Sequence, residues 1–342
     1  MNVTSVVSCL AACTAFLVLA GLPAAHAQDA TALQARHADL LLSLDSNPFQ
    51  RPIHLESSDV DDRLAGDIYA RIDQPYAVVG PALQDMAHWC DILILHQNVK
   101  HCMASADEKN TLNLSVGRKH DQPLGDAFQF EFQYAVIAAD ADYLQIELHA
   151  RQGPIGTSDY RIMLEVAALD ARRSFLHLSY GYNSGVMARA VMRSYLATVG
   201  RDKVGFSLVE PSAPEAPVYV GGTLGVIERN TMRYYLAIEA YLGALSVSVP
   251  EQIEKRLNDW HSGIERYPRQ LHELERSEYL DMKRREIRRQ QTPDVGRAST
   301  PPGPLSASVS QDAVSAAMIC GRTAFHIACP VVSLLSISST AP

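Results

Sequence analysis

Apolar and polar residues alternate along several consecutive segments between Thr111 and Glu210, and this alternation constrains the fold more than any other feature of the chain. A period of two places the apolar side chains on one face of a strand and the polar ones on the other. Strands that follow one another through turns, each with one polar face, are typical of an antiparallel meander. We therefore predict antiparallel strands here. The segments are AFQFEFQYAVI, YLQIELHA, YRIMLEVAAL, SFLHLSYGY and KVGFSLV.

One strand and two short helical segments are predicted before this region. The segment DRLAGDIYARID, which begins at Asp62, alternates in the same way and predicts a half-buried strand. Gln74-Pro75 ends it, and PYAVVGPALQDMAHW follows with apolar residues at helical spacing and Pro75 suited to a first turn. Gly80-Pro81 must shorten or kink this helix. The next segment, CDILILHQNVKHC, is predicted as a second short helix or a bent segment.

A long amphipathic helix is predicted after the turn GGTLG, in the segment VIERNTMRYYLAIEAYLGAL. We assign its charged residues Glu228, Arg229, Arg233 and Glu239 to a solvated face. The alternative is that Glu239 faces a cavity as an acid, a base or a ligand anchor. The apolar stripe of the helix contains Ile227, Thr231, Tyr234, Ile238, Tyr241 and Leu245.

Residues 1–27 resemble an export signal that is removed from the mature protein. The run from Val6 to Leu22 is apolar and uncharged, and Ala25-His26-Ala27 has the small-x-small pattern that signal peptidase accepts. Cleavage there makes Gln28 the first residue and predicts a periplasmic or secreted protein. Two alternatives stay open: a retained membrane anchor, and lipoprotein processing at Cys13, which follows Leu10-Ala11-Ala12.

Four of the six cysteines remain after this cleavage. In an oxidising compartment we expect Cys90 to pair with Cys102, and Cys320 with Cys329. On one straight helix Cys90 and Cys102 would lie about 18 Å apart, far beyond disulfide reach. The chain must therefore bend between Trp89 and Cys102.

The size and charge of the chain limit the class of protein. It has 342 residues, of which 47% are hydrophobic, so it can bury a normal core. Its formal net charge is −8, and no basic patch appears before the last third of the sequence. A basic surface is the usual footprint of a nucleic-acid partner, so we expect no nucleic-acid binding.

The last part of the chain divides into a charged segment and a tail. Residues 250–291 have helical propensity and many charges, and we predict a charged helical extension. Its basic run KRREIRR, at 283–289, is either a solvated helix face or a contact for anionic lipid headgroups. Residues 292–342 are rich in Pro, Ser and Ala, which predicts a disordered or low-complexity tail. The apolar anchors of the extension are Ile253, Leu257, Trp260, Ile264, Leu271 and Leu274.

The order of the predicted elements is that of a helix-grip fold, in which a curved antiparallel sheet wraps around its last helix. Within it, GDIYARIDQPYAVVGPALQDMAHW resembles the opening pattern of the START-like (SRPBCC) superfamily. An aromatic residue that often follows the valine is here Val79. The resemblance covers residues 62–245 and implies an α+β START-like domain at 62–249, after a lead-in segment at 28–61. The matching residues are Ile72, Pro75, Val78, Val79, Leu83 and Trp89.

The resemblance implies a hydrophobic cavity between the sheet and the last helix, which relatives use for lipids, sterols or polycyclic aromatics. An aromatic strand face and a tyrosine-bearing helix can line such a pocket, with hydroxyls available to orient a ligand. Taken singly, each of these residues can equally be ordinary core. The predicted ligand-binding residues are Phe130, Phe132, Tyr134, Tyr234, Ile238 and Tyr241.

Other chemistry finds little support in the sequence. His88, Cys90, His96, His101 and Cys102 crowd one segment, but their spacing fits no established zinc finger, so we expect a disulfide with surface histidines and no metal. No G-x-S-x-G elbow is present, and GGTLG lacks the spacing of a phosphate-binding loop. The superfamily shares no catalytic motif, so we predict no catalytic residue and no cofactor.

Three hypotheses of function remain. The leading one is an exported protein that binds an apolar small molecule or lipid without catalysing a reaction. The second is an enzyme of the same fold, a cyclase or lyase. The third is a non-catalytic protein whose charged helical extension docks on an envelope protein partner.

Overall fold

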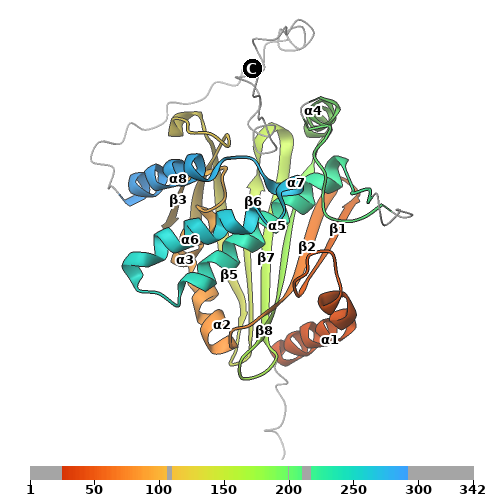
Figure 1. The fold of residues 1–342 in the computed structure, drawn as a ribbon, viewed down its shortest axis with the longest axis vertical. Helices are drawn as coiled ribbons and strands as arrows, with labels where there is room; N and C mark the ends of the chain where they lie inside the picture. The colour runs from red at the N-terminus through yellow and green to blue at the C-terminus, as the bar shows by residue number, and fades with distance from the viewer. Residues whose placement is uncertain (1–24, 106–109, 199, 210–216, 292–342) are drawn as a thin grey trace, which may run out of the picture.

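The computed structural model describes residues 25–105, 110–198, 200–209 and 217–291 (Figure 1). Residues 1–24, which hold most of the predicted export signal, lie outside the described residues, and so do the predicted tail and the predicted pair Cys320–Cys329. Among the described residues, no helix combines the length and the apolar character that a membrane crossing requires.

Eight strands form one antiparallel sheet, as the alternation predicts. Their order is β1-β2-β8-β7-β6-β5-β4-β3, and every neighbouring pair is antiparallel. The predicted apolar face of β2 is buried at alternate residues, and β6 and β7 show the same period. The strands are β1 (Ile53–Val60), β2 (Arg63–Ile72), β3 (Val99–Ser105), β4 (Thr111–Val116), β5 (Phe128–Ala139), β6 (Tyr143–Gln152), β7 (Thr157–Ala168) and β8 (Ser174–Ser184).

The long helix α5 (Gly222–Ala244) lies across one face of this sheet, which we call the inner face (Figure 1). It packs on β1, β2 and β8, so the curved antiparallel sheet with a long helix across it is confirmed as an α+β fold. The helix begins after Gly221 and lies against Gly66 of β2, where a Cβ atom would meet Thr231 Oγ1 at 2.4 Å. A residue without a side chain therefore lets the helix approach the strand closely.

A second layer of helices covers α5 on the side away from the sheet, so α5 is not the last helix. Helix α6 (Val249–Ile264) packs along α5, α7 (Pro268–Leu271) also contacts it, and α8 (Arg276–Gln291) packs on β3 and α6. The predicted anchors Leu257 and Trp260 belong to the same core cluster as the inner face of the sheet. The charged helical segment is therefore packed onto the domain.

One end of the outer face of the sheet is covered by α1 (Ala25–Asp45), which precedes the first strand. Neighbouring strand residues point to opposite clusters: Tyr143 and Phe175 pack with α1, whereas Leu144 and Leu176 pack in the main core. The sequence places α1 and β1 in a lead-in segment. In the structure β1 pairs with β2 along its whole length and α1 packs on one end of the outer face.

Two short helices and a strand form the region around the predicted disulfide. Helix α2 (Tyr76–Gln84) follows Pro75, and α3 (Met86–Leu93) begins directly after Asp85, whose side chain accepts a hydrogen bond from the Ala87 amide. The chain then turns into β3. The disulfide Cys90–Cys102 joins α3 to β3 with a Cα–Cα distance of 5.2 Å, so both the pairing and the predicted bend are confirmed.

Two predicted segments differ in the structure. KVGFSLV does not form a strand of the sheet. Its backbone instead pairs with residues 218–220, through hydrogen bonds such as that from the Gly205 amide to the Val220 carbonyl and through an isolated bridge from Leu208 to Tyr219. A helix, α4 (Val186–Ala197), stands between it and β8, which leads the chain away from the sheet edge. The segment NVKHC contains the start of β3, because Val99–Ser105 pairs with β4 and extends the sheet.

Removing the disulfide tests its contribution to stability. We expect the double variant Cys90→Ser/Cys102→Ser to lower the free energy of unfolding by about 3 kcal/mol, because the bridge closes a short loop in the unfolded chain. Urea unfolding followed by circular dichroism measures this difference. A reductant should destabilise the natural protein and leave the variant unchanged. Equal stability of the two oxidised proteins would contradict the expectation.

His177 on the outer face makes the stability depend on pH. Its ring lies between Asp67, 2.9 Å from Nε2, and Glu165, 2.7 Å from Nδ1. Burial by itself lowers the pKa of His177, but the hydrogen bonds and charges of the two carboxylates outweigh it and raise the pKa to about 9.

Because this pKa is raised above the ordinary 6.5, the stabilisation is complete below pH 6.5 and is lost as the pH rises through about 9. We expect the free energy of unfolding to fall by up to about 3 kcal/mol over that range. Urea unfolding at stepped pH measures it. The His177→Gln variant should lack this fall, and an equal fall in the variant would assign the pH dependence to other groups.

Candidate functional site

A continuous series of aromatic rings runs across the inner face of the sheet to helix α5. The distance between ring centroids is 5.0 Å for Phe130 and Tyr160, and 4.9 Å for Tyr160 and Tyr182. It is 6.1 Å for Tyr182 and Tyr180. Tyr234 of α5 lies 5.0 Å from Tyr180, and His96 stacks on Tyr234 at 5.0 Å. We call this series the aromatic line. Its members are Phe130, Tyr160, Tyr182, Tyr180, Tyr234 and His96.

Three hydroxyl groups of the aromatic line make no hydrogen bond to another described residue. Within the described ranges, no hydrogen bond joins the hydroxyl of Tyr180, Tyr182 or Tyr234 to another residue. The hydroxyl of Tyr160, by contrast, donates to Thr157 Oγ1 at 2.9 Å. Burial raises the pKa of Tyr180, Tyr182 and Tyr234, so all three stay protonated and can donate.

The six predicted ligand-binding residues are divided between different places. Phe130 and Tyr234 belong to the aromatic line, and Phe132 stacks on Phe130 at 5.5 Å. The hydroxyl of Tyr134 donates to the Gln84 carbonyl at 2.5 Å, at the end of α2. The remaining two are Ile238, which is buried in the main core, and Tyr241, whose ring lies 4.5 Å from the Arg256 guanidinium.

A buried group of charges lies beneath α8, next to the backbone of His96. The Lys283 ammonium donates to the carbonyls of His96 and Val99, each at 2.7 Å, and to Glu286 Oε2 at 2.8 Å. Lys100 reaches the other oxygen of Glu286 at 3.1 Å. Burial lowers the pKa of Lys283, and it lowers the pKa of Lys100 to about 8.

A second buried group of charges is centred on Glu273. Its carboxylate pairs with Lys119, with Lys203 at 2.8 Å and with Arg233 at 3.2 Å. Burial alone raises the pKa of Glu273, but the three cations outweigh it and lower the pKa to about 2. Burial lowers the pKa of Lys119 and of Arg233. Glu273 is therefore ionised and holds three cations together.

His96 connects the aromatic line with both charged groups. Its side chain is 3% exposed, and its Nδ1 accepts a hydrogen bond from the Asn98 amide at 3.2 Å. Burial lowers the pKa of His96 well below 6.5, and the charges of Arg233 and Lys283 lower it further. The ring is therefore neutral and carries its proton on Nε2, which has no partner among the described residues.

Most of these residues are not predictable from the sequence. Glu228, Arg229 and Arg233 are 0%, 1% and 2% exposed and so do not form the predicted solvated face, and His96 is buried and not at the predicted surface position. Glu239, the alternative cavity residue, instead pairs with Arg51 near the surface. A usable signal is present in α8, where the buried residues Tyr279, Met282, Lys283 and Glu286 follow helical spacing.

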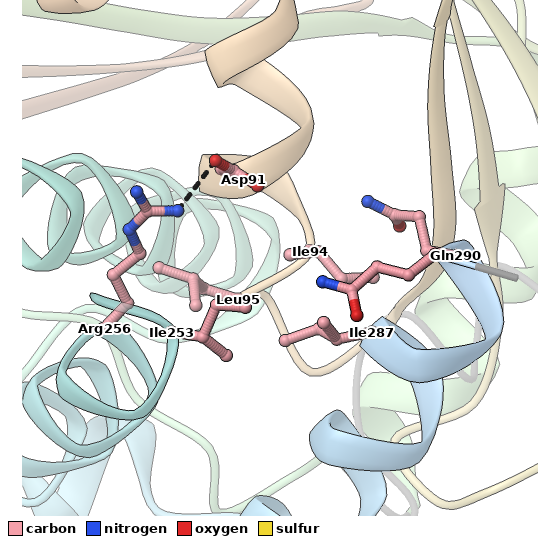
Figure 2. Close-up of a pocket in the computed structure, with 8 residues that line it drawn as sticks. Asp91, Ile94, Leu95, Ile253, Arg256, Ile287 and Gln290 are labelled. Carbon is pink, nitrogen blue, oxygen red and sulfur yellow. Dashed lines mark ion pairs between the residues drawn. The ribbon is translucent and has the colours of Figure 1, made fainter. Parts of the chain in front are cut away.

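A small pocket lies between α3, α6 and α8 (Figure 2). Its walls are the apolar side chains of Ile94, Leu95, Ile253 and Ile287. Beside them Arg256 forms an ion pair with Asp91, with 2.7 Å between nitrogen and oxygen. The cavity volume is about 80 Å³, whereas sites for drug-sized ligands are several hundred Å³. This pocket has room for a few water molecules.

A wider depression lies on the outside of the sheet, near the turn between β1 and β2. Polar residues line it, and Arg63 and Arg161 both pair with Asp159 there, at 2.9 and 3.2 Å. Its donors and acceptors are thus already engaged. In the part of the chain that the structure describes, no group of three His, Cys, Asp or Glu residues could hold a metal ion.

Comparisons with known proteins give structural neighbours only. No family model and no curated protein matches the chain. Norcoclaurine synthase from Thalictrum flavum is 9% identical with a TM-score of 0.31, over 41% of this chain and 84% of that one. A START superfamily protein from Mycobacterium smegmatis is 13% identical with a TM-score of 0.28, over 39% and 89%. Human StAR-related lipid transfer protein 5 is 9% identical with a TM-score of 0.26, over 50% and 89%.

Proposed function

We propose that this protein binds an apolar small molecule or lipid between the inner face of the sheet and α5. The observation that carries the proposal is the set of three hydroxyls, on Tyr180, Tyr182 and Tyr234, that lack partners among the described residues. None of the three oxygens is among the fully buried atoms without a partner, so each hydroxyl keeps some accessible surface on rings that are otherwise packed in the core. Three of them on adjoining rings suit a ligand that carries a few polar groups.

The surroundings of these hydroxyls fit the same kind of ligand. The rings of the aromatic line belong to the main core, and aromatic walls with a few placed polar groups are typical of small-molecule sites. Tyr234 keeps partial exposure although its ring packs against Tyr180 and His96. The small pocket of Figure 2 is no competing site for a lipid, because of its volume.

We propose in addition that the protein works in the periplasm or outside the cell. The support is the signal-like sequence of residues 1–27 and the disulfide Cys90–Cys102, since disulfides persist in oxidising compartments. Mass spectrometry of the exported protein should find Gln28 as the first residue. A mature protein that retains residues 1–27 would contradict this proposal.

An enzyme, a cyclase or lyase of the same fold, is the second candidate. The neutral ring of His96 beside Tyr234 favours it, because a buried imidazole with an unpartnered Nε2–H can donate a hydrogen bond to a substrate oxygen on which negative charge develops. Conversion of an extracted ligand to a product of different mass would establish the enzyme. Unchanged ligand after prolonged incubation would leave binding as the function.

Docking on an envelope protein is the third candidate, through the exposed charges of α6 and α8. Arg284 and Glu254 pair there at 2.8 Å on the surface. Because Leu257 and Trp260 lie in the core, deleting the extension would also damage the fold. Reversing surface charges such as Arg284→Glu is the suitable change, and unaltered capture of a partner would count against this candidate.

Removing two hydroxyls tests the leading proposal. The Tyr180→Phe/Tyr234→Phe variant keeps both rings but loses two donors, so we expect affinity for dodecanoate or dodecanol to fall about tenfold or more. Isothermal titration calorimetry measures it, and native mass spectrometry identifies any lipid that copurifies. The matched control is Tyr134→Phe, whose hydroxyl binds the Gln84 carbonyl, and its affinity should not change.

Two outcomes would overturn the proposal. A natural protein that copurifies with no apolar ligand and binds neither dodecanoate nor dodecanol would exclude the function. Equal loss of affinity in the Tyr134→Phe control would show that the effect is not located at the aromatic line.

A further inference from the structure

Two buried hydrogen-bond donors lack partners at the end of the aromatic line. They are Nε2 of His96 and Nε of Arg233, whose side chains are 3% and 2% exposed, and neither atom has a partner among the described residues. Arg233 precedes Tyr234 in α5, and His96 stacks on Tyr234. A buried donor without a partner is costly, and in native structures such groups are few.

Neither donor can easily turn away or lose its proton. Nδ1 of His96 already accepts from the Asn98 amide, so its proton stays on Nε2. The terminal nitrogens of Arg233 are held by Asn230 Oδ1 at 3.3 Å and by Glu273 Oε1 at 3.2 Å, which fixes the guanidinium in place. Both donors are thus set in position before any ligand arrives.

The buried charges around these donors are unbalanced. Lys100, Lys119, Arg233 and Lys283 are each at most 2% exposed, and the carboxylates buried with them are those of Glu273 and Glu286. Among the described residues of this cluster, four cations face two carboxylates, which leaves a formal excess of two positive charges. All four cations act electrostatically on His96.

An anionic group would satisfy both donors and reduce this excess. Hydrogen bonds from charged or buried donors to a carboxylate or phosphate are about twice as strong as neutral ones. Water could accept hydrogen bonds from both donors, but it would not compensate the excess positive charge of the buried cluster. Since His96 stacks on Tyr234 and the charge of Arg233 acts on His96, we place the anion at the His96 end of the aromatic line.

We propose that the ligand is an acidic amphiphile. Its carboxylate or phosphate lies at the His96 end of the aromatic line, held by His96 Nε2, Arg233 Nε and the hydroxyls of Tyr234 and Tyr180, and its apolar part follows the rings toward Phe130. This inference rests on the proposed function, because it requires a ligand between the sheet and α5. The aromatic rings recognise the apolar part, and the buried cations select the head group. Arg233 and His96 are then binding residues that select an acid over the corresponding alcohol.

A pair of probes that differ only in the head group tests the inference. We expect the natural protein to bind dodecanoate about tenfold or more tightly than dodecanol, measured by isothermal titration calorimetry at one pH and ionic strength. Acetate is the third probe and should bind weakly, because it lacks the apolar chain. The test in the natural protein requires no variant and stands even if a variant fails to fold.

Two variants locate the preference. His96→Phe keeps the ring against Tyr234 and removes the donor, and Arg233→Lys keeps the charge but removes the guanidinium. In each variant we expect dodecanoate to bind no more than about threefold more tightly than dodecanol. The affinity for dodecanol itself should change little. His261→Phe is the control, since this buried histidine packs against Tyr279 and not against the aromatic line, and it should keep the full ratio.

The outcomes separate this inference from the proposed function. If neither dodecanoate nor dodecanol binds, the proposed function itself fails. If both bind with equal affinity, the apolar site stands and the acidic head group is excluded. Acetate that binds as tightly as dodecanoate would overturn the claim that one ligand occupies both the cations and the aromatic line. If His261→Phe also loses the preference for dodecanoate over dodecanol, the placement of the head group at His96 is contradicted.

Discussion

The contact between Gly66 and Thr231 fixes where α5 lies on the sheet, and the interior of the protein is arranged from that point. The Thr231 hydroxyl donates to the Ile227 carbonyl of its own helix, so the helix presents a compact surface to the strand. Gly66 is paired in register with Tyr180 of the next strand. Three residues after Thr231, on the same helix face, Tyr234 meets that Tyr180 ring. One close approach thus brings strand and helix tyrosines together.

The second layer of helices explains why so many charges are buried. Helix α5 is covered by the sheet on one side and by α6 and α7 on the other, so Arg229 and Arg233 cannot reach solvent. Buried ion pairs are weak evidence for stability, because apolar residues of similar volume often serve as well. An arrangement with more cations than carboxylates is harder still to explain by stability. Its cost is more consistent with a role in recognition.

Much of the fold is predictable because, in a strand with one polar face, the alternation of residues shows which side chains point to the core. The alternation identified β2 and β5–β8, and the prolines and cysteines located the short helices and the bend. Strand β1 was not predicted. Most of its residues are at least partly exposed, so its sequence needs few apolar residues and shows no clear alternation. KVGFSLV alternates well, but it follows α4 and its backbone bonds to residues 218–220 and not to the sheet. The charged face of α5 was misassigned because the covering helices come later in the sequence.

The site was harder to predict than the fold, since residues of one type on one element have different neighbours. Tyr234 and Tyr241 share a helix stripe but lie about 10 Å apart along the axis. The first meets Tyr180 and His96, whereas the second packs against Arg256. Likewise Tyr134 ends beside α2 with its hydroxyl engaged, while Phe130 joins the rings of β7 and β8. Periodicity predicts the face on which a residue lies. Which hydroxyls on that face have no partner depends on where the helix crosses the strands, and the sequence does not show this.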